Sequence, residues 1–139
     1  MKVRDVMTPD VEVIHPDALL AEASRRMREE DIGALPVGEG DRLIGMVTDR
    51  DIICRAVAEG KDPVRTPVSA AMSDQVLYCF DDQSTEEVAA NMGENQVRRL
   101  PVVNRDKRLV GIVSLGDLSS RGARREAGGA LNEISEPSR

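Results

Sequence analysis

The chain has almost no aromatic residues: its 139 residues include one Tyr, one Phe and no Trp. Proteins that bind single-stranded nucleic acid stack bases on several aromatic side chains, so the composition argues against that class. Any planar ligand would have to be held by aliphatic side chains and backbone groups. Positive charge is also in deficit, because 19 Lys and Arg face 25 Asp and Glu, giving a net charge of −6. The basic footprint of nucleic-acid binding is missing, and we expect no nucleic-acid partner.

Cysteine and histidine are scarce, with Cys54, Cys79 and His15 as their complete set. Two cysteines do not make a disulfide framework, and a single histidine does not make a multi-histidine metal site. We expect Cys54 to lie in a helical core and His15 in a surface turn. No residue that would orient a Cys–His nucleophile pair can be identified, so we predict that the protein is not an enzyme.

Long hydrophobic runs are absent as well. No stretch approaches the ~18 apolar residues of a membrane-spanning helix, and the first residues, MKVRDVMTPDVEV, hold no apolar run of signal-peptide length. We therefore expect a cytoplasmic protein with no membrane partner. The length suits one modest domain or two very small ones.

What the chain does contain is an internal repeat, because a shift of 65 positions places Leu35-Pro36-Val37 on Leu100-Pro101-Val102. After one inserted residue near Lys107 the shift becomes 66, and Gly45 meets Gly111. We place the domain boundaries at 1–60 for repeat 1, 61–67 for a linker, 68–120 for repeat 2 and 121–139 for a polar tail. A unit of ~60 residues is marginal alone, so we expect the copies to bury faces against each other.

Hydrophobic periodicity predicts the order β-α-β-β-α in each copy, an α/β (α+β) class of fold. In the first copy we expect a strand at 11–14, a helix with Asp17 as its N-cap, a hairpin of strands at 34–37 and 43–47, and a second helix from Thr48. The corresponding features of the second copy are a strand at 76–80, a helix capped by Asp82, strands at 100–103 and 109–113, and a helix from Ser114.

A short motif ends the third strand of each copy: a glycine, two apolar residues, a hydroxyl residue, two variable positions and an aspartate. It covers Gly45–Asp51 and Gly111–Asp117. One interpretation is a capping box, in which the hydroxyl and the acid satisfy free amides of the helix. The other is a grip on a nucleoside phosphate, with the helix N-terminus and hydroxyl on phosphate and the carboxylate on the ribose diol. The two interpretations are compatible, and both remain open.

Taken together, the repeats resemble the cystathionine β-synthase (CBS) domain, and the pair resembles a Bateman module. The matching stretches are Val6-Met7-Thr8, the helix to Ile32, Gly33–Val37 and Gly45–Asp51, then Ala71-Met72-Ser73, Val97–Val102 and Gly111–Asp117. The resemblance covers roughly residues 3–120. It implies tandem repeats packed about a pseudo-two-fold axis, a homodimer formed through the helices, and an adenosine compound (AMP, ADP, ATP, NAD or S-adenosylmethionine) as regulatory ligand. No other cofactor is implied, and the regulated protein would be a separate partner.

The resemblance also implies two ligand clefts, in which the hydroxyl–aspartate motif of one copy faces the adenine pocket of the other. Cleft A would comprise Thr8, Val11, Gly33, Ala34, Pro36, Ile112, Ser114 and Asp117. Cleft B would comprise Ser73, Val76, Arg98, Arg99, Pro101, Met46, Thr48, Arg50 and Asp51. Arginines would contact phosphate, although a solvated turn is an equally good interpretation of Arg98 and Arg99. The clefts differ, because Gly33 stands where the second copy has Arg98. The alternative function is a structural dimerisation adaptor with empty clefts.

Overall fold

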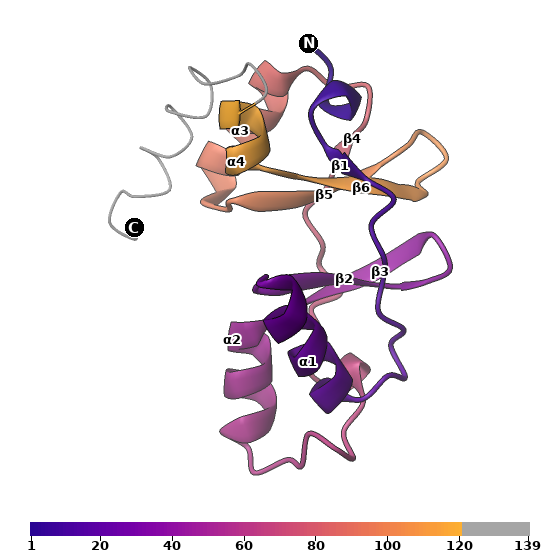
Figure 1. Ribbon diagram of the computed structural model, residues 1–139, viewed down its shortest axis with the longest axis vertical. Coiled ribbons are helices and arrows are strands. Elements are labelled where there is room, and N and C mark those ends of the chain that lie inside the picture. Colours follow the sequence, from indigo (N-terminus) through magenta and orange to yellow (C-terminus); the bar gives the residue numbers. More distant parts are fainter. Residues whose placement is uncertain (121–139) are drawn as a thin grey trace. The chain divides into compact units, whose positions relative to one another are not determined.

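The computed structural model describes residues 1–120 and forms two compact units (Figure 1). The first-repeat unit is Glu12–Val76. The second-repeat unit combines Met1–Val11 with residues 77–120. The compact units therefore do not coincide with the sequence repeats, because each unit takes in the segment that opens the other copy. The predicted polar tail at 121–139 lies outside the described residues.

The first-repeat unit is a two-stranded antiparallel hairpin with helices on one side (Figure 1). Its elements are α1 (Leu20–Glu30), β2 (Ala34–Glu39), β3 (Arg42–Thr48), α2 (Asp49–Ile52), the π-helical turn η2 (Ile53–Val57) and the 3-10 turn η3 (Val68–Ala70). The core is aliphatic and comprises Ile14, Leu20, Ala23, Met27, Leu35, Val37, Val47, Ile52, Ala56, Val68 and Ala71.

The second-repeat unit holds a four-stranded sheet in the order β1-β6-β5-β4, with α3 and α4 over one face (Figure 1). Its elements are the 3-10 turn η1 (Val3–Asp5), β1 (Thr8–Pro9), β4 (Cys79–Phe80), α3 (Thr85–Asn95), β5 (Arg99–Val103), β6 (Leu109–Ser114) and α4 (Leu115–Ser120). The core comprises Val3, Val6, Cys79, Val88, Ala89, Met92, Leu100, Val102, Val113 and Leu118.

Two arms complete the units by equivalent contacts: the N-terminal arm (Met1–Val11) and the middle arm (residues 63–76). The Val68 amide donates to the Ala18 carbonyl at 2.7 Å, and the Val3 amide donates to the Gln83 carbonyl at 2.9 Å. Val3 and Val68 are both 0% exposed. Each arm thus supplies a core side chain and backbone hydrogen bonds to a unit made mainly of the other copy.

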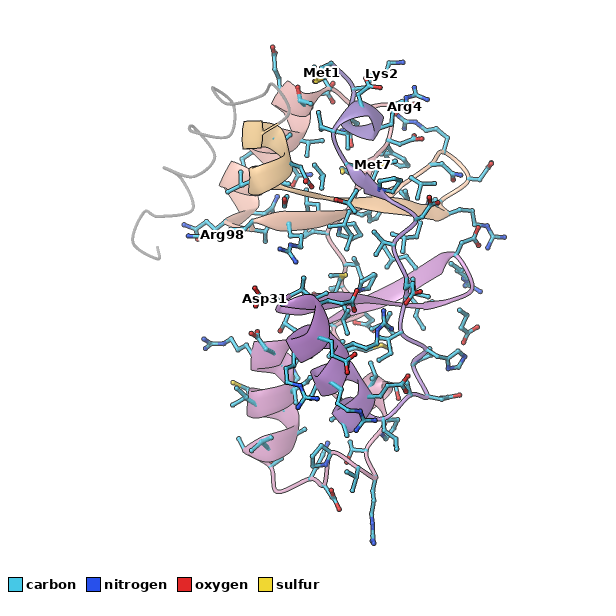
Figure 2. All side chains as sticks on the ribbon, viewed as in Figure 1. Met1, Lys2, Arg4, Met7, Asp31 and Arg98 are labelled. Atoms are coloured by element: carbon cyan, nitrogen blue, oxygen red, sulfur yellow. The ribbon has the colours of Figure 1, made fainter. Side chains whose placement is uncertain are left out.

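A glycine lets each arm cross a strand of its unit: the middle arm crosses β3 and the N-terminal arm crosses β6. A methyl group on Gly111 would lie 2.6 Å from the Thr8 carbonyl oxygen and 2.8 Å from Sδ of Met7, which is labelled in Figure 2. A methyl group on Gly45 would lie 2.7 Å from the Ser73 carbonyl oxygen. Real Cβ atoms do not approach backbone this closely, so both crossings require glycine.

The structure confirms the α+β class, the long helices, the hairpins and the helix starts at Thr48 and Ser114. The strand predicted at 11–14 was wrong, because this stretch makes a single parallel bridge, Ile14 to Val37. In the second copy, β4 keeps the last two residues of the predicted strand at 76–80.

The predicted N-caps Asp17 and Asp82 were also wrong, because α1 begins after Leu19 and α3 after Ser84. At α1 the middle arm takes over the capping role: the Leu20 amide donates to the Thr66 carbonyl at 2.9 Å. Asp82 instead accepts two hydrogen bonds from Arg105.

Candidate functional site

The hydroxyl–aspartate motif of the first repeat joins the end of β3 to the first turn of α2. Thr48 Oγ1 accepts a hydrogen bond from the Asp51 amide at 3.0 Å, and Asp51 Oδ2 accepts one from the Thr48 amide at 3.0 Å. This reciprocal pair is a capping box, and it satisfies two amides that the helix leaves unbonded. The capping interpretation is confirmed for the first repeat.

The second repeat builds the same box between β6 and α4. Ser114 Oγ accepts from the Asp117 amide at 3.1 Å, and Asp117 Oδ2 accepts from the Ser114 amide at 3.0 Å. Ser114 and Asp117 are half-buried, as are Thr48 and Asp51. The boxes hold their hydroxyl and carboxylate groups at fixed places at the end of a strand. Their use for a ligand stays a prediction.

Each arm places a second hydroxyl residue beside the strand that leads into the box. Ser73 of the middle arm exchanges backbone hydrogen bonds with Met46 at 2.8 and 2.9 Å. Thr8 of the N-terminal arm pairs with Ile112 in the β1–β6 ladder. Met46 and Ile112 each precede the hydroxyl of a box by two residues, so they share its face of the strand. The sequence motif and the arm thus meet within each unit.

The hairpins bring further predicted residues to the same strands. Ala34 pairs with Thr48 and Pro36 with Met46 in the first-repeat unit, and Pro101 pairs with Ile112 in the second. Val11 and Val76 are half-buried at the ends of the arms.

Each predicted cleft draws residues from both units. The first-repeat unit holds Ser73, Val76, Met46, Thr48, Arg50 and Asp51 of cleft B with Gly33, Ala34 and Pro36 of cleft A. The second-repeat unit holds Thr8, Val11, Ile112, Ser114 and Asp117 of cleft A with Arg98, Arg99 and Pro101 of cleft B. The structure brings the residues of each group into one unit. Their assembly into clefts A and B stays a prediction.

The two boxes differ in their charged neighbours. In the second-repeat unit Arg99 pairs with Ser114, and the Arg98 carbonyl accepts from the Leu115 amide at 3.0 Å. Both arginines are exposed, and Figure 2 shows Arg98 extending outward from its unit.

At the equivalent place in the first-repeat unit, the Gly33 carbonyl accepts from the Asp49 amide at 3.0 Å. A methyl group on Gly33 would lie 3.1 Å from Asp49 Oδ2, so the glycine makes room for this carboxylate. Sequence reasoning did not single out Asp49, although aligning it with Leu115 would have revealed the charge difference.

The two cysteines and the histidine lie in different environments. Cys54 is exposed, which corrects the prediction of a core position, and Cys79 is buried. Burial, with a smaller contribution from the charge of Asp81, raises the pKa of the Cys79 thiol to about 12. The His15 side chain is 54% exposed, as expected for a surface turn, and lies 3.7 Å from Asp17.

Residues 1–120 contain no group of three or more His, Cys, Asp or Glu that could hold a metal ion. No helix in this part of the chain is long and apolar enough to cross a membrane.

Comparison with known proteins identifies the repeats. The model of the CBS domain matches residues 3–57 and again residues 68–123. The CBS domain-containing protein YhcV of Bacillus subtilis is 42% identical over 134 residues, which is 96% of this chain and 94% of YhcV. The crystal structure of Hypoxic Response Protein I with two coordinated zinc ions superposes with a TM-score of 0.78 at 40% identity, over 86% of this chain and 98% of that one.

Two further solved structures contain adenosine compounds. CBSX2 in complex with AMP matches with a TM-score of 0.76 at 27% identity, over 90% of this chain and 98% of that one. The CBS domain pair of protein MJ0100 in complex with 5-methylthioadenosine and S-adenosyl-L-methionine matches with a TM-score of 0.74 at 27% identity, over 87% and 98%. Because the family model matches both copies and YhcV is 42% identical over 94% of its length, this chain belongs to the CBS domain family as a tandem pair of repeats.

Proposed function

We propose that the protein is a non-catalytic regulatory module that binds an adenosine-containing ligand between its two repeats and signals to a separate partner protein. The observation that carries the proposal is the duplicated capping box with an arm hydroxyl residue on the strand beside it. Both repeats keep this arrangement although most of their other residues differ. The AMP and S-adenosylmethionine complexes of structural relatives support the ligand class.

The proposed chemistry uses groups that the boxes already hold in place. The hydroxyl of Thr48 or Ser114 would donate to a phosphate oxygen, next to the amides of the first helical turn. The carboxylate of Asp51 or Asp117 would accept from the ribose hydroxyls. Each hydroxyl accepts from an amide in its box and keeps its own hydrogen to donate, and each aspartate uses only Oδ2 in the box, so binding would cost little rearrangement. Arg50, Arg98 and Arg99 are the proposed phosphate contacts.

The output would depend on a homodimer and on states that the ligand binds unequally, because a ligand shifts only such an equilibrium. The helix formed by α2 and η2 presents Ile53 and Val57, which are 59% and 57% exposed. This face is our candidate for the homodimer contact. The second candidate function is a structural dimerisation adaptor with empty clefts. It would dimerise through the same face, and its capping boxes would serve only to cap the helices.

Thermal unfolding of the purified protein with AMP, ADP, ATP, NAD and S-adenosylmethionine tests the proposal. A ligand at ~100 times its dissociation constant should add about 2.7 kcal/mol, which raises the midpoint by several degrees for a chain of this size. Asp51→Ala or Asp117→Ala should abolish the rise in the unfolding midpoint that is due to ligand binding in the corresponding cleft.

The matched control is Ser84→Ala, since Ser84 Oγ caps α3 by accepting from the Glu87 amide at 3.1 Å and belongs to neither predicted cleft. This variant should lose about 1 kcal/mol of stability and keep the ligand shift. Equal midpoints with and without every compound would reject ligand binding and favour the adaptor.

A further inference from the structure

The middle arm is held against the first-repeat unit by a side chain that sequence reasoning left out. Arg55, in the π-helical turn η2, directs Nη1 at two consecutive carbonyl oxygens of the arm, those of Ala71 at 3.3 Å and Met72 at 3.1 Å. The next residue of the arm is Ser73. The guanidinium therefore binds the arm immediately before the hydroxyl residue proposed to face the ligand.

The same short stretch is fixed on its other side by β3. Ser73 exchanges two backbone hydrogen bonds with Met46, and Gly45 allows the Ser73 carbonyl to approach the strand. Thr48 follows two residues after Met46 on the same strand and opens the helix that carries Arg55. The arm therefore contacts both β3 and the helix that carries Arg55, and the capping box joins that strand to that helix within one unit.

Arg55 is well suited to this task because it spans two elements that are distant in sequence. A charged donor makes a stronger hydrogen bond to a carbonyl than a neutral one does, and its two acceptors lie 16 and 17 residues away. The helix at this point is π-helical, with the Ala58 amide donating to the Ile53 carbonyl at 2.8 Å. Such turns occur frequently at functional sites.

We infer that Arg55 is a positioning residue, which holds Ser73 beside the Thr48–Asp51 box by binding the Ala71 and Met72 carbonyls. This assignment rests on the proposed function for its consequence in ligand binding, although the placement of the arm itself does not depend on a ligand. Through Arg55, a displacement of α2 on ligand binding would be passed to the arm.

Amide hydrogen exchange of the unliganded protein, followed by NMR, tests the placement. Arg55→Met should raise the exchange rates of the Ser73 and Met46 amides roughly tenfold, as expected for loss of a charge-assisted hydrogen bond, relative to the β2–β3 amides of Leu35 and Val47. Arg55→Lys keeps one charged donor and should restore part of the protection.

Arg26→Met is the matched control, because Arg26 Nη1 also binds a backbone carbonyl of this unit, that of Val13 at 3.2 Å, but outside the middle arm. It should leave the Ser73 and Met46 amides protected. If Arg55→Met changes no amide of the arm, raises exchange equally throughout the unit, or has the same effect on the Ser73 and Met46 amides as Arg26→Met, Arg55 does not position Ser73 and the inference is overturned.

AMP titration by calorimetry then tests the consequence, in an Asp117→Ala background so that only the Thr48–Asp51 box keeps its carboxylate. Arg55→Met should weaken AMP binding about tenfold, with partial rescue by Arg55→Lys and no change in Arg26→Met. An arm loosened in the exchange experiment with unchanged AMP affinity would overturn the positioning role. If the unmodified protein binds none of the adenosine compounds, the proposed function fails, while the exchange result still decides the placement.

Discussion

Arg105 is paired with two side chains from the stretch that leads into α3. Its guanidinium carbon lies 4.1 Å from the centre of the Phe80 ring, and its Nε and Nη2 donate to the two carboxylate oxygens of Asp82 at 2.8 and 2.6 Å. The hydrogen bond from Arg105, followed by its charge, lowers the pKa of Asp82. A residue predicted as a helix cap therefore anchors the β5–β6 turn instead.

This pair predicts a specific pH dependence of stability. Because the pKa of Asp82 is lower in the folded state than in the unfolded chain, the ion pair stabilises the fold above the ordinary aspartate pKa, roughly 4. The contribution is lost as pH falls through the folded pKa. We expect Arg105→Ala to lower the urea midpoint most at neutral pH, and the gap to the unmodified protein to narrow toward pH 2.5.

At low pH a smaller difference in urea midpoint between the variant and the unmodified protein should remain, because the cation–π contact does not titrate in this range. In an Asp82→Asn background the effect of Arg105→Ala should depend much less on pH, because only the weaker attraction to Asp81 and Glu87 then titrates. A gap in the unmodified background that stays constant from pH 7 to pH 2.5 would contradict the assignment to Asp82.

The cysteines should differ sharply in reactivity. At pH 8 the exposed Cys54 should react rapidly with a thiol reagent, whereas Cys79 should react only on unfolding, because it is buried and its pKa is raised to about 12. Counting labelled thiols by mass spectrometry should find one modified thiol in the native protein and two in urea. Cys54→Ser should leave no rapidly labelled thiol, and rapid labelling of that variant would show that Cys79 is accessible.

Among the secondary-structure elements, each arm crosses a strand with no room for a side chain at the crossing glycine. The carbonyls of Thr8 and Ser73 would lie within 2.7 Å of a methyl group on Gly111 and Gly45. Backbone cannot yield as a flexible side chain does, so alanine would force the arm away from the strand.

We therefore expect Gly111→Ala and Gly45→Ala each to cost about 2 kcal/mol of stability, within the usual range for overpacking. Gly116→Ala is the matched control, since its added methyl would meet only Ser114 Oγ, at 3.5 Å, in the first turn of α4. It should be neutral or stabilising, because alanine favours the helix. Denaturant unfolding measures all three, and equal stabilities would show that the crossings have room to relax.

At the scale of the whole molecule, the exchanged arms make stability cross the boundary between sequence repeats. Val68 belongs to the second copy by sequence, yet its side chain is fully buried in the first-repeat unit, and Val3 is buried in the other. Replacing either valine by alanine should therefore lower the stability of the unit that is formed mainly by the other copy.

Val68→Ala should raise hydrogen exchange in the β2–β3 hairpin, and Val3→Ala in strands β5 and β6, with a loss of about 2 kcal/mol for each buried valine. The two variants serve as controls for each other, because they remove the same group from equivalent sites. Faster exchange in the opposite unit would contradict the exchange of arms.

Features with local signals could be predicted from the amino-acid sequence. Alternating apolar residues around a polar turn specify the hairpins, helical spacing specifies α1 and α3, and a hydroxyl three residues before an acid specifies the boxes at Thr48 and Ser114. The repeat also pointed to the family, because it presents the same pattern twice in the same order.

The unit that each arm completes could not be predicted from the sequence and became known from the fold. Met7 and Met72, like Val3 and Val68, are equivalent residues, so the side-chain pattern of one arm fits either hairpin and does not distinguish between them. The helix cap of α1 was predicted wrongly for the same reason, because its first amides donate to carbonyls of the middle arm, which lies far along the chain. The position of Cys54 was also predicted wrongly, because a short helix with apolar residues on several sides does not reveal by its periodicity which side meets the core.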